Sequence, residues 1–269
     1  MSALSSAGAT SATHEYRVQR ELHPADETAL LVVLPHPDDE SFGSGGTMAK
    51  FAAAGHKVHY LCATYGDMGR RMGRPAFATR ESLRDVREVE LREACEQLGC
   101  TFSYMGLRDK CVEFEDLHEV GARIRAFIEE FQPSTVIGFY PGYGVHPDHD
   151  AIGQATVLAL RQMPRDARPR YLATAVGDHE QLGRELGEPN VNSDIRGYAR
   201  NKIEALRAHR SQTEVMFAHW LKEMGVEFGE LPADVAKVDE QSKRWHQRIT
   251  ESERYYDLDP ELPTVLDED

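Results

Sequence analysis

The sequence predicts an α/β fold: a doubly wound, mainly parallel sheet with helices on both faces and a covering segment toward the C-terminal end. Residues 30–34 are five consecutive aliphatic residues, and a run without polar alternation is typical of a parallel strand buried on both faces. Strand-like and helix-like stretches then alternate, as in parallel sheets whose crossover connections are helices. Further strands are expected at residues 57–64, 101–105, 135–140 and 171–176.

Glycines and capping residues delimit the helices between these strands. The first helical stretch follows the glycine-rich segment 41–47 and stops at Gly55, and the second stops at Gly99. Glycine commonly follows a last helical turn because it adopts the left-handed conformation without strain. Asp116 is the expected N-cap of the third helix, and Pro147 fits the first position of the fourth.

The chain is expected to form one folded domain between two tails. Residues 1–28 lack the basic start and apolar stretch of a secretory signal and predict a mobile N-terminal arm. Residues 29–255 form the domain, in which 178–194 is either a loop or a covering element and 196–210 is a helix. Residues 256–269 predict an acidic C-terminal tail.

Composition disfavours two classes of partner. The chain has 31 basic and 45 acidic side chains, and its formal charge of −14 repels nucleic acid and anionic membranes. No apolar segment approaches the roughly 18 to 20 residues that cross a bilayer. The four cysteines lack C-x-x-C spacing, which predicts reduced thiols in a cytoplasmic protein. We therefore expect a small-molecule substrate, and a homo-oligomer as the assembled state.

Histidines and carboxylates follow two of the predicted strands. His36 and Asp39 come directly after the strand at 30–34, and His149 lies in the first turn of the helix after the strand at 135–140. Because parallel strands present their carboxyl ends at one edge of a sheet, these side chains are expected to converge. Two imidazoles and one carboxylate form an open site of the catalytic zinc kind. Fe(II) uses the same donors, so both metals stay open.

Two more polar residues at these strand ends predict acid–base roles. Asp38 can take a proton from metal-bound water, whose pKa falls toward about 7. His146 can stabilise an oxyanion or protonate a leaving amine. Such a site would hydrolyse a carbonyl compound. The simpler alternative is an acidic turn that faces water, and a histidine immediately upstream disfavours it.

Two other stretches suggest different chemistry. The glycines of the 41–47 segment approach a dinucleotide-binding fingerprint, but Met48 stands in place of its third glycine, and the carboxylates upstream would repel a pyrophosphate. The loop at 66–75 carries three arginines, and Arg80 extends this cationic patch. The loop is either solvated or an anion-binding lid over the site.

The two polar motifs together resemble those of the PIG-L/LmbE family of metal-dependent N-acetylglucosamine deacetylases. They are Pro-His-Pro-Asp-Asp-Glu at residues 35–40 and His-Pro-Asp-His at residues 146–149, and the resemblance runs from about residue 30 to 212. It implies a Rossmann-like fold and zinc held by the two histidines and the aspartate named above. It also implies Asp38 as general base and His146 as the oxyanion or acid group.

The resemblance further implies substrate-binding positions. Arg87, Arg108 and Asp109 match sugar-site positions, and His209 matches a motif near the site. The chain looks most like the second type of bacillithiol-pathway deacetylase, whose substrate would be N-acetylglucosaminyl malate and whose co-product would be acetate. It departs from relatives in mycothiol synthesis at Gly144, where those carry a tyrosine two residues before the first histidine of the second motif.

Four rival functions share parts of this pattern. A bacillithiol S-conjugate amidase, or a deacetylase of another N-acetylglucosamine conjugate, would use the same metal chemistry with a different pocket. A non-catalytic sugar-binding or metal-storage protein would not need Asp38. A nicotinamide-dependent oxidoreductase is disfavoured by the incomplete glycine fingerprint.

Overall fold

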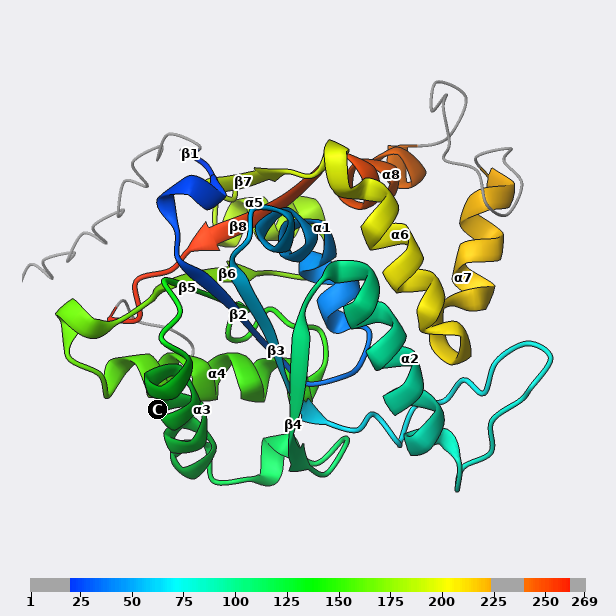
Figure 1. Cartoon of the computed structure of the whole chain (residues 1–269), viewed down its shortest axis with the longest axis horizontal. Helices are drawn as coiled ribbons and strands as arrows, with labels where there is room; N and C mark the ends of the chain where they lie inside the picture. The colour runs from blue at the N-terminus through cyan, green and yellow to red at the C-terminus, as the bar shows by residue number, and fades with distance from the viewer. Residues whose placement is uncertain (1–19, 224–239, 262–269) are drawn as a thin grey trace, which may run out of the picture.

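The structure, a computed structural model, describes residues 20–223 and 240–261 of the chain (Figure 1). Within these ranges eight strands form one sheet: β1 (Arg20–Glu21), β2 (Ala29–Leu34), β3 (Lys57–Thr64), β4 (Thr101–Leu107), β5 (Thr135–Phe139), β6 (Arg170–Thr174), β7 (Val191–Asp194) and β8 (Ser252–Asp257). Their order is β1-β7-β8-β6-β5-β2-β3-β4. Strand β8 runs antiparallel to both of its neighbours, and the other pairs are parallel. The predicted mainly parallel sheet is therefore confirmed.

Helices cover both faces of this sheet, as predicted. They are α1 (Asp39–Ala53), α2 (Leu83–Leu98), α3 (Leu117–Phe131), α4 (Pro147–Arg161), α5 (His179–Glu185), α6 (Ala199–Ala208), α7 (Arg210–Glu223) and α8 (Glu240–Thr250). Figure 1 shows α1, α2 and α6 on one side of the central strands and α3 and α4 on the other. The strands predicted up to residue 176 lie within two residues of their observed ends.

Strand β2 lies in the middle of the sheet and is buried on both faces. Leu30 and Val32 pack in the core that includes residues of α1, α2 and α6. Leu31 and Val33 pack in the opposite core, with residues of α3 and α4. All four side chains are fully buried, which accounts for a strand without polar alternation.

Helix α1 begins earlier than predicted. It starts at Asp39, so the glycine-rich segment lies inside the helix rather than before it. Glycine in a helix interior costs roughly 0.5 to 1 kcal/mol, which is why the sequence disfavours this assignment. Packing explains it, because a Cβ on Gly46 would lie 2.6 Å from the side chain of Ile195. Gly46 therefore allows Ile195 to pack closely against α1.

The C-terminal part contributes two strands that the sequence pattern does not predict, β7 and β8. Glu253 of β8 is a charged residue of the kind expected at a surface, yet it is buried. Its carboxylate accepts hydrogen bonds from Lys202 Nζ at 2.6 Å and from the backbone N–H groups of Gly46 and Thr47 at 2.9 and 2.7 Å. These partners compensate the buried charge and fasten β8 to α1.

The folded region extends beyond both predicted limits. Strand β1 pairs with β7 and Leu22 is buried, so residues 20–28 belong to the fold and not to a mobile arm. Residues 256 and 257 belong to β8 and not to an acidic tail. Residues 258–261 are also described, and Leu258 is buried. The remainder of the predicted arm and tail, residues 1–19 and 262–269, lies outside the described residues.

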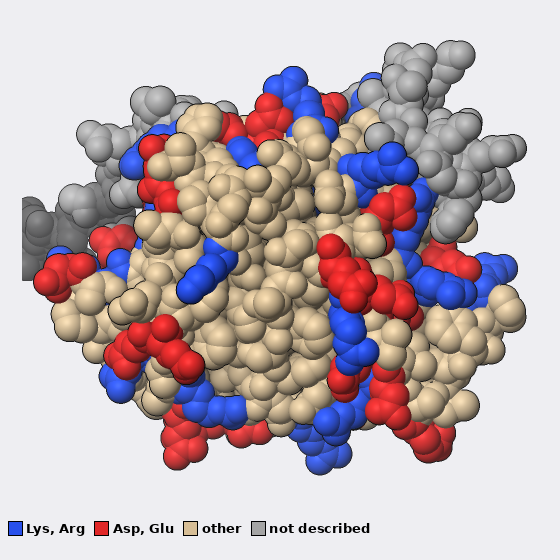
Figure 2. Space-filling view, in the orientation of Figure 1, with Lys and Arg blue, Asp and Glu red and all other residues tan. Residues whose placement is uncertain are grey.

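The surface in view carries no large patch of one charge. Figure 2 shows Lys and Arg intermixed with Asp and Glu around a central area without charged residues. Among the described residues, none of the helices has the length and hydropathy to span a bilayer. All four cysteines are free thiols, as predicted.

Candidate metal centre

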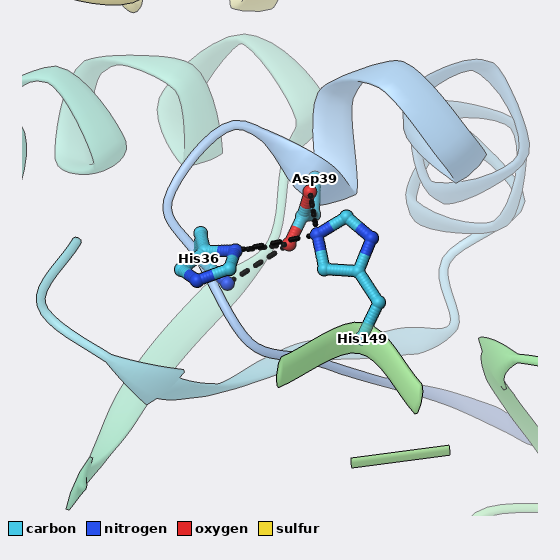
Figure 3. Close-up of side chains that lie close together, drawn as sticks. All are labelled: His36, Asp39 and His149. Carbon is cyan, nitrogen blue, oxygen red and sulfur yellow. Dashed lines mark hydrogen bonds and ion pairs between the residues drawn. The ribbon is translucent and has the colours of Figure 1, made fainter. Parts of the chain in front are cut away.

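The candidate metal ligands come from the carboxyl ends of two neighbouring parallel strands. His36 lies two residues after β2, and Asp39 is the first residue of α1. His149 is the third residue of α4, which follows β5. Because β2 and β5 pair in parallel, both connections emerge at the same edge of the sheet. The three predicted side chains therefore converge, as Figure 3 shows.

The donor atoms have the spacing that a tetrahedral ion requires. His36 Nδ1 lies 3.4 Å from Asp39 Oδ2 and 3.3 Å from His149 Nε2, and His149 Nε2 lies 3.3 Å from Asp39 Oδ1. Zinc ligands lie about 2.0 to 2.1 Å from the ion, which places them about 3.3 to 3.4 Å from one another. Burial alone would raise the pKa of Asp39, but the two imidazoles lower it, so the carboxylate is ionised. This donor set fits a divalent metal ion.

Two carboxylates contact the ring nitrogen of His36 that faces away from the other candidate ligands. Its Nε2 lies 3.2 Å from Asp148 Oδ2 and 3.3 Å from Asp109 Oδ1, both buried. Asp148 is held in turn by the backbone N–H groups of Lys110 and Val112 at 2.7 and 3.1 Å. A carboxylate on the far nitrogen fixes the ring and increases its basicity toward a metal. The sequence analysis missed Asp148, although its place inside the second motif was a usable signal.

Packing and one backbone carbonyl fix the ring of His149. Phe139 stacks on it with centroids 4.1 Å apart and planes 7° apart. His149 Nδ1 lies 2.9 Å from the carbonyl oxygen of Gly144 and donates to it, so Nε2 keeps its lone pair for the metal. A Cβ on Gly144 would lie 2.5 Å from the Cβ of His149. Glycine at this position therefore permits the close approach of the ligand.

Asp38 lies beside the ligands and is held by charged neighbours. Its backbone has a φ of 113°, and its N–H donates to Glu40 Oε2 at 2.9 Å. Its Oδ2 accepts from Arg87 Nη2 at 3.0 Å. Burial raises the pKa of the Asp38 carboxyl to about 6, against the lowering effect of Arg87. A carboxyl group poised near neutral pH suits proton transfer.

His146 caps helix α4 and is also close to the ligands. Its Nδ1 accepts from the backbone N–H of Asp148 at 3.1 Å, so a neutral ring carries its hydrogen on Nε2. Burial and the neighbouring rings of His36 and His149 lower the pKa of His146. The ring is therefore a neutral donor, which favours oxyanion stabilisation over proton delivery.

The structure does not place all of the predicted substrate-binding residues where a ligand can reach them. Arg87 and Asp109 are buried and engaged with Asp38 and His36 respectively. His209 is fully buried, and its Nε2 lies 2.7 Å from Glu40 Oε1, so it supports the site from beneath. Arg108 is exposed. Glu40, which links His209 to the Asp38 backbone, is a further residue that the sequence analysis missed.

A second group of three possible ligands overlaps the first. His36, His146 and Asp148 also have donor atoms close together. However, His146 Nδ1 and both Asp148 oxygens already accept backbone hydrogen bonds. The first group is therefore the better candidate for a metal site.

Comparisons with known proteins agree with this arrangement. The PIG-L family model, described as GlcNAc-PI de-N-acetylase, matches residues 31–160. A Bacillus cereus protein named probable N-acetyl-alpha-D-glucosaminyl L-malate deacetylase 2 is 46% identical over 191 residues, which are 71% of this chain and 86% of that protein. A Bacillus subtilis protein of the same name is 45% identical over 188 residues, 70% of this chain and 84% of that protein.

Solved structures share the fold at lower identity. N,N'-diacetylchitobiose deacetylase from Pyrococcus horikoshii superposes with a TM-score of 0.62 at 21% identity, covering 88% of this chain and 85% of that one. At this identity the similarity bears on architecture alone, and it agrees with the predicted α/β fold.

Proposed function

The chain belongs to the PIG-L family of de-N-acetylases, and from this premise we propose that it removes the acetyl group from N-acetylglucosaminyl malate and releases acetate. The observation that carries the proposal is the convergence of His36, Asp39 and His149 beside a buried Asp38. The Bacillus relatives named for this reaction support the choice of substrate.

The three donors would hold a divalent metal, with zinc as our proposal and Fe(II) as the alternative that uses the same ligands. Three protein donors leave a coordination position open, as catalytic sites require. When bound, the ion polarises the amide carbonyl and lowers the pKa of a coordinated water toward about 7.

The residues around this position would carry the proton transfers. Asp38 accepts a proton from the attacking water, and Arg87 orients its carboxylate. His146, neutral and protonated on Nε2, donates a hydrogen bond to the oxygen on which charge develops. Asp38, then protonated, is the group that can deliver the proton to the departing amine nitrogen. The amine of the sugar and free acetate are the products.

A direct assay tests this proposal. Purified, metal-analysed protein is incubated with N-acetylglucosaminyl malate and, in parallel, with a bacillithiol S-conjugate, and acetate and free amine are measured. We expect acetate release from the malyl glycoside to exceed conjugate cleavage by at least about tenfold in kcat/KM. A preference for the conjugate would replace the proposal with the amidase function.

A further inference from the structure

A large cavity lies at the same edge of the sheet as the candidate metal ligands, and none of the metal-site residues described above lines it. Its volume is about 770 Å³, within the range of small-molecule sites, and it is bounded by the end of β6, helix α5, and residues of α7, α8 and β8. We call it the α8 cavity, after Arg244 and Arg248, which line it from that helix.

Two lining residues connect the α8 cavity with the elements that carry the candidate metal ligands. Gly43, which lines it, lies one helical turn after Asp39 in α1. Thr174, another lining residue, pairs with Phe139, whose ring stacks on His149. The cavity therefore opens at the same sheet edge as the donors, one strand farther along. A substrate whose amide lies at the metal has room there for its other end.

The cavity is lined by three arginines and two glutamates, so positive charge is in excess there. No ion pair involves Arg244 or Arg248 within the part of the chain that the structure describes. The acidic residues that line the cavity are already paired, Glu188 with Arg254 at 2.9 Å and Glu253 with Lys202 at 2.6 Å.

Two buried polar atoms in the cavity wall also lack partners. Thr174 Oγ1 and Trp220 Nε1 have no hydrogen-bond partner among the described residues, although their side chains are only 7% and 3% exposed. A buried donor or acceptor without a partner is unfavourable, so both atoms are available to a polar ligand in the cavity. Both residues line the same cavity as the two arginines.

We propose that the α8 cavity binds the carboxylate-bearing end of the substrate, with Arg244 and Arg248 as its anion-binding residues and Thr174 and Trp220 as hydrogen-bonding partners. This proposal rests on the proposed deacetylase function. It places the malate group in a subsite formed mostly by Thr174 and the residues after it. The family motifs do not cover most of this part of the chain.

The alternative anion site is the cationic loop predicted from the sequence. In the structure, Arg71 donates to the Gln212 carbonyl at 2.5 Å, and Arg80 donates to the Gly69 carbonyl at 2.8 Å. These two arginines thus hold the loop to the body of the protein. Arg70 is exposed, so substituting it tests the loop as an anion-binding site.

The test compares two substrates in metal-loaded enzyme. N-acetylglucosaminyl malate carries two carboxylates, and methyl N-acetyl-α-glucosaminide carries none. Arg244→Gln and Arg248→Gln should each lower kcat/KM for the malyl substrate by about tenfold or more, mainly by raising KM. For the methyl glycoside, kcat/KM should change by less than about twofold. Arg248→Lys should recover part of the loss. Arg200→Gln, on the exposed surface of α6, is the control.

Other outcomes overturn the subsite. Equal losses on both substrates, or no loss on either, would contradict it, and a selective loss in Arg70→Gln alone would assign the malate group to the loop. Should wild type release acetate from neither substrate, the proposed function fails. Calorimetric binding of L-malate then tests the cavity separately: about tenfold weaker binding in Arg248→Gln supports the subsite, and equal or absent binding contradicts it.

Discussion

The guanidinium of Arg87 forms a buried ion pair with the carboxylate of Asp38, with Nη2 3.0 Å from Oδ2 and the two side chains only 4% and 17% exposed. Arg87 also donates to the carbonyl oxygens of Gly66, at 2.8 Å, and of Pro37. One side chain thus fixes the backbone on both sides of the site together with Asp38, our proposed general base. The family resemblance implied a sugar-binding role for Arg87, and from these contacts we propose that it positions Asp38.

Arg87→Met should therefore damage both stability and turnover. It leaves two buried carbonyls and a carboxylate without their donor, which predicts a loss of about 2 to 3 kcal/mol in the free energy of unfolding. Acetate release should fall at least about tenfold while the metal content stays unchanged. The control is Arg92→Met on the same helix, whose ion pair with Glu88 is exposed and should cost less than about 1 kcal/mol. Indistinguishable behaviour of the two variants in denaturation and assay would refute this role.

Asp38→Asn tests the general base itself. The amide keeps the shape and the hydrogen bond from Arg87 but cannot accept a proton from water. Turnover should fall by roughly 10²- to 10⁴-fold, the usual size of general acid–base catalysis, with metal content and melting temperature close to wild type. The comparison is made by acetate release and metal analysis on the same samples. Near-normal turnover would mean that another group, such as Glu40, takes the proton.

Gly144→Ala tests the fit between glycine and metal ligand. The added Cβ would lie 2.5 Å from the Cβ of His149, so the ligand must move away from its two companions. Metal affinity should fall about 10- to 100-fold, as for other changes that misplace a ligand. Gly197→Ala is the control, because a Cβ there meets nothing within 4 Å. Competition with a chelator measures both affinities, and equal values would show that the site tolerates the methyl group.

His59 should make the stability of the fold depend on pH, independently of the metal centre. It lies on β3 against the ring of Phe127. Its ring nitrogens form hydrogen bonds with the hydroxyl groups of Thr101, at 2.7 Å, and Ser103, at 2.9 Å. Burial lowers its pKa to about 4, from 6.5 in the unfolded chain. The unfolded chain therefore binds the proton first, and stability is lost as pH falls from 6.5 toward 4.

The His59→Gln variant isolates this contribution. Because the ring is partly exposed, we expect wild type to lose only about 1 kcal/mol more than the variant between pH 7 and pH 5. Urea unfolding of both proteins at the two pH values gives the difference. Parallel pH profiles would show that the ring does not resist protonation in the folded state.

Local sequence patterns were sufficient to predict that the three candidate ligands converge, because each follows a strand that is recognisable by itself. Parallel pairing of β2 and β5 then brings His36 and His149 together without further information. The roles of Arg87 and His209 were not predictable in this way. Their partners lie 49 and 169 residues away, at Asp38 and Glu40, and only the packed structure shows that both side chains are buried.

The C-terminal strands escaped prediction for a related reason. Three of the six residues of β8 are charged, so the sequence indicates a surface segment there. Its buried Glu253 is tolerated because Lys202 and two backbone N–H groups of α1 donate hydrogen bonds to the carboxylate. Such compensation depends on tertiary contacts, and so does the α8 cavity, which β8 and α8 help to form.

We expect one metal ion, held by His36, Asp39 and His149, to be required for acetate release. Chelator-treated protein is titrated with Zn²⁺ and, separately, with anaerobic Fe²⁺, and acetate release from N-acetylglucosaminyl malate is measured at each step. Wild type should gain activity in proportion to metal up to one equivalent per chain. His149→Ala should bind less metal and recover almost none of the activity, while His118→Ala, on the exposed surface of α3, should match wild type. Full activity in the metal-free protein, or in His149→Ala, would contradict the account.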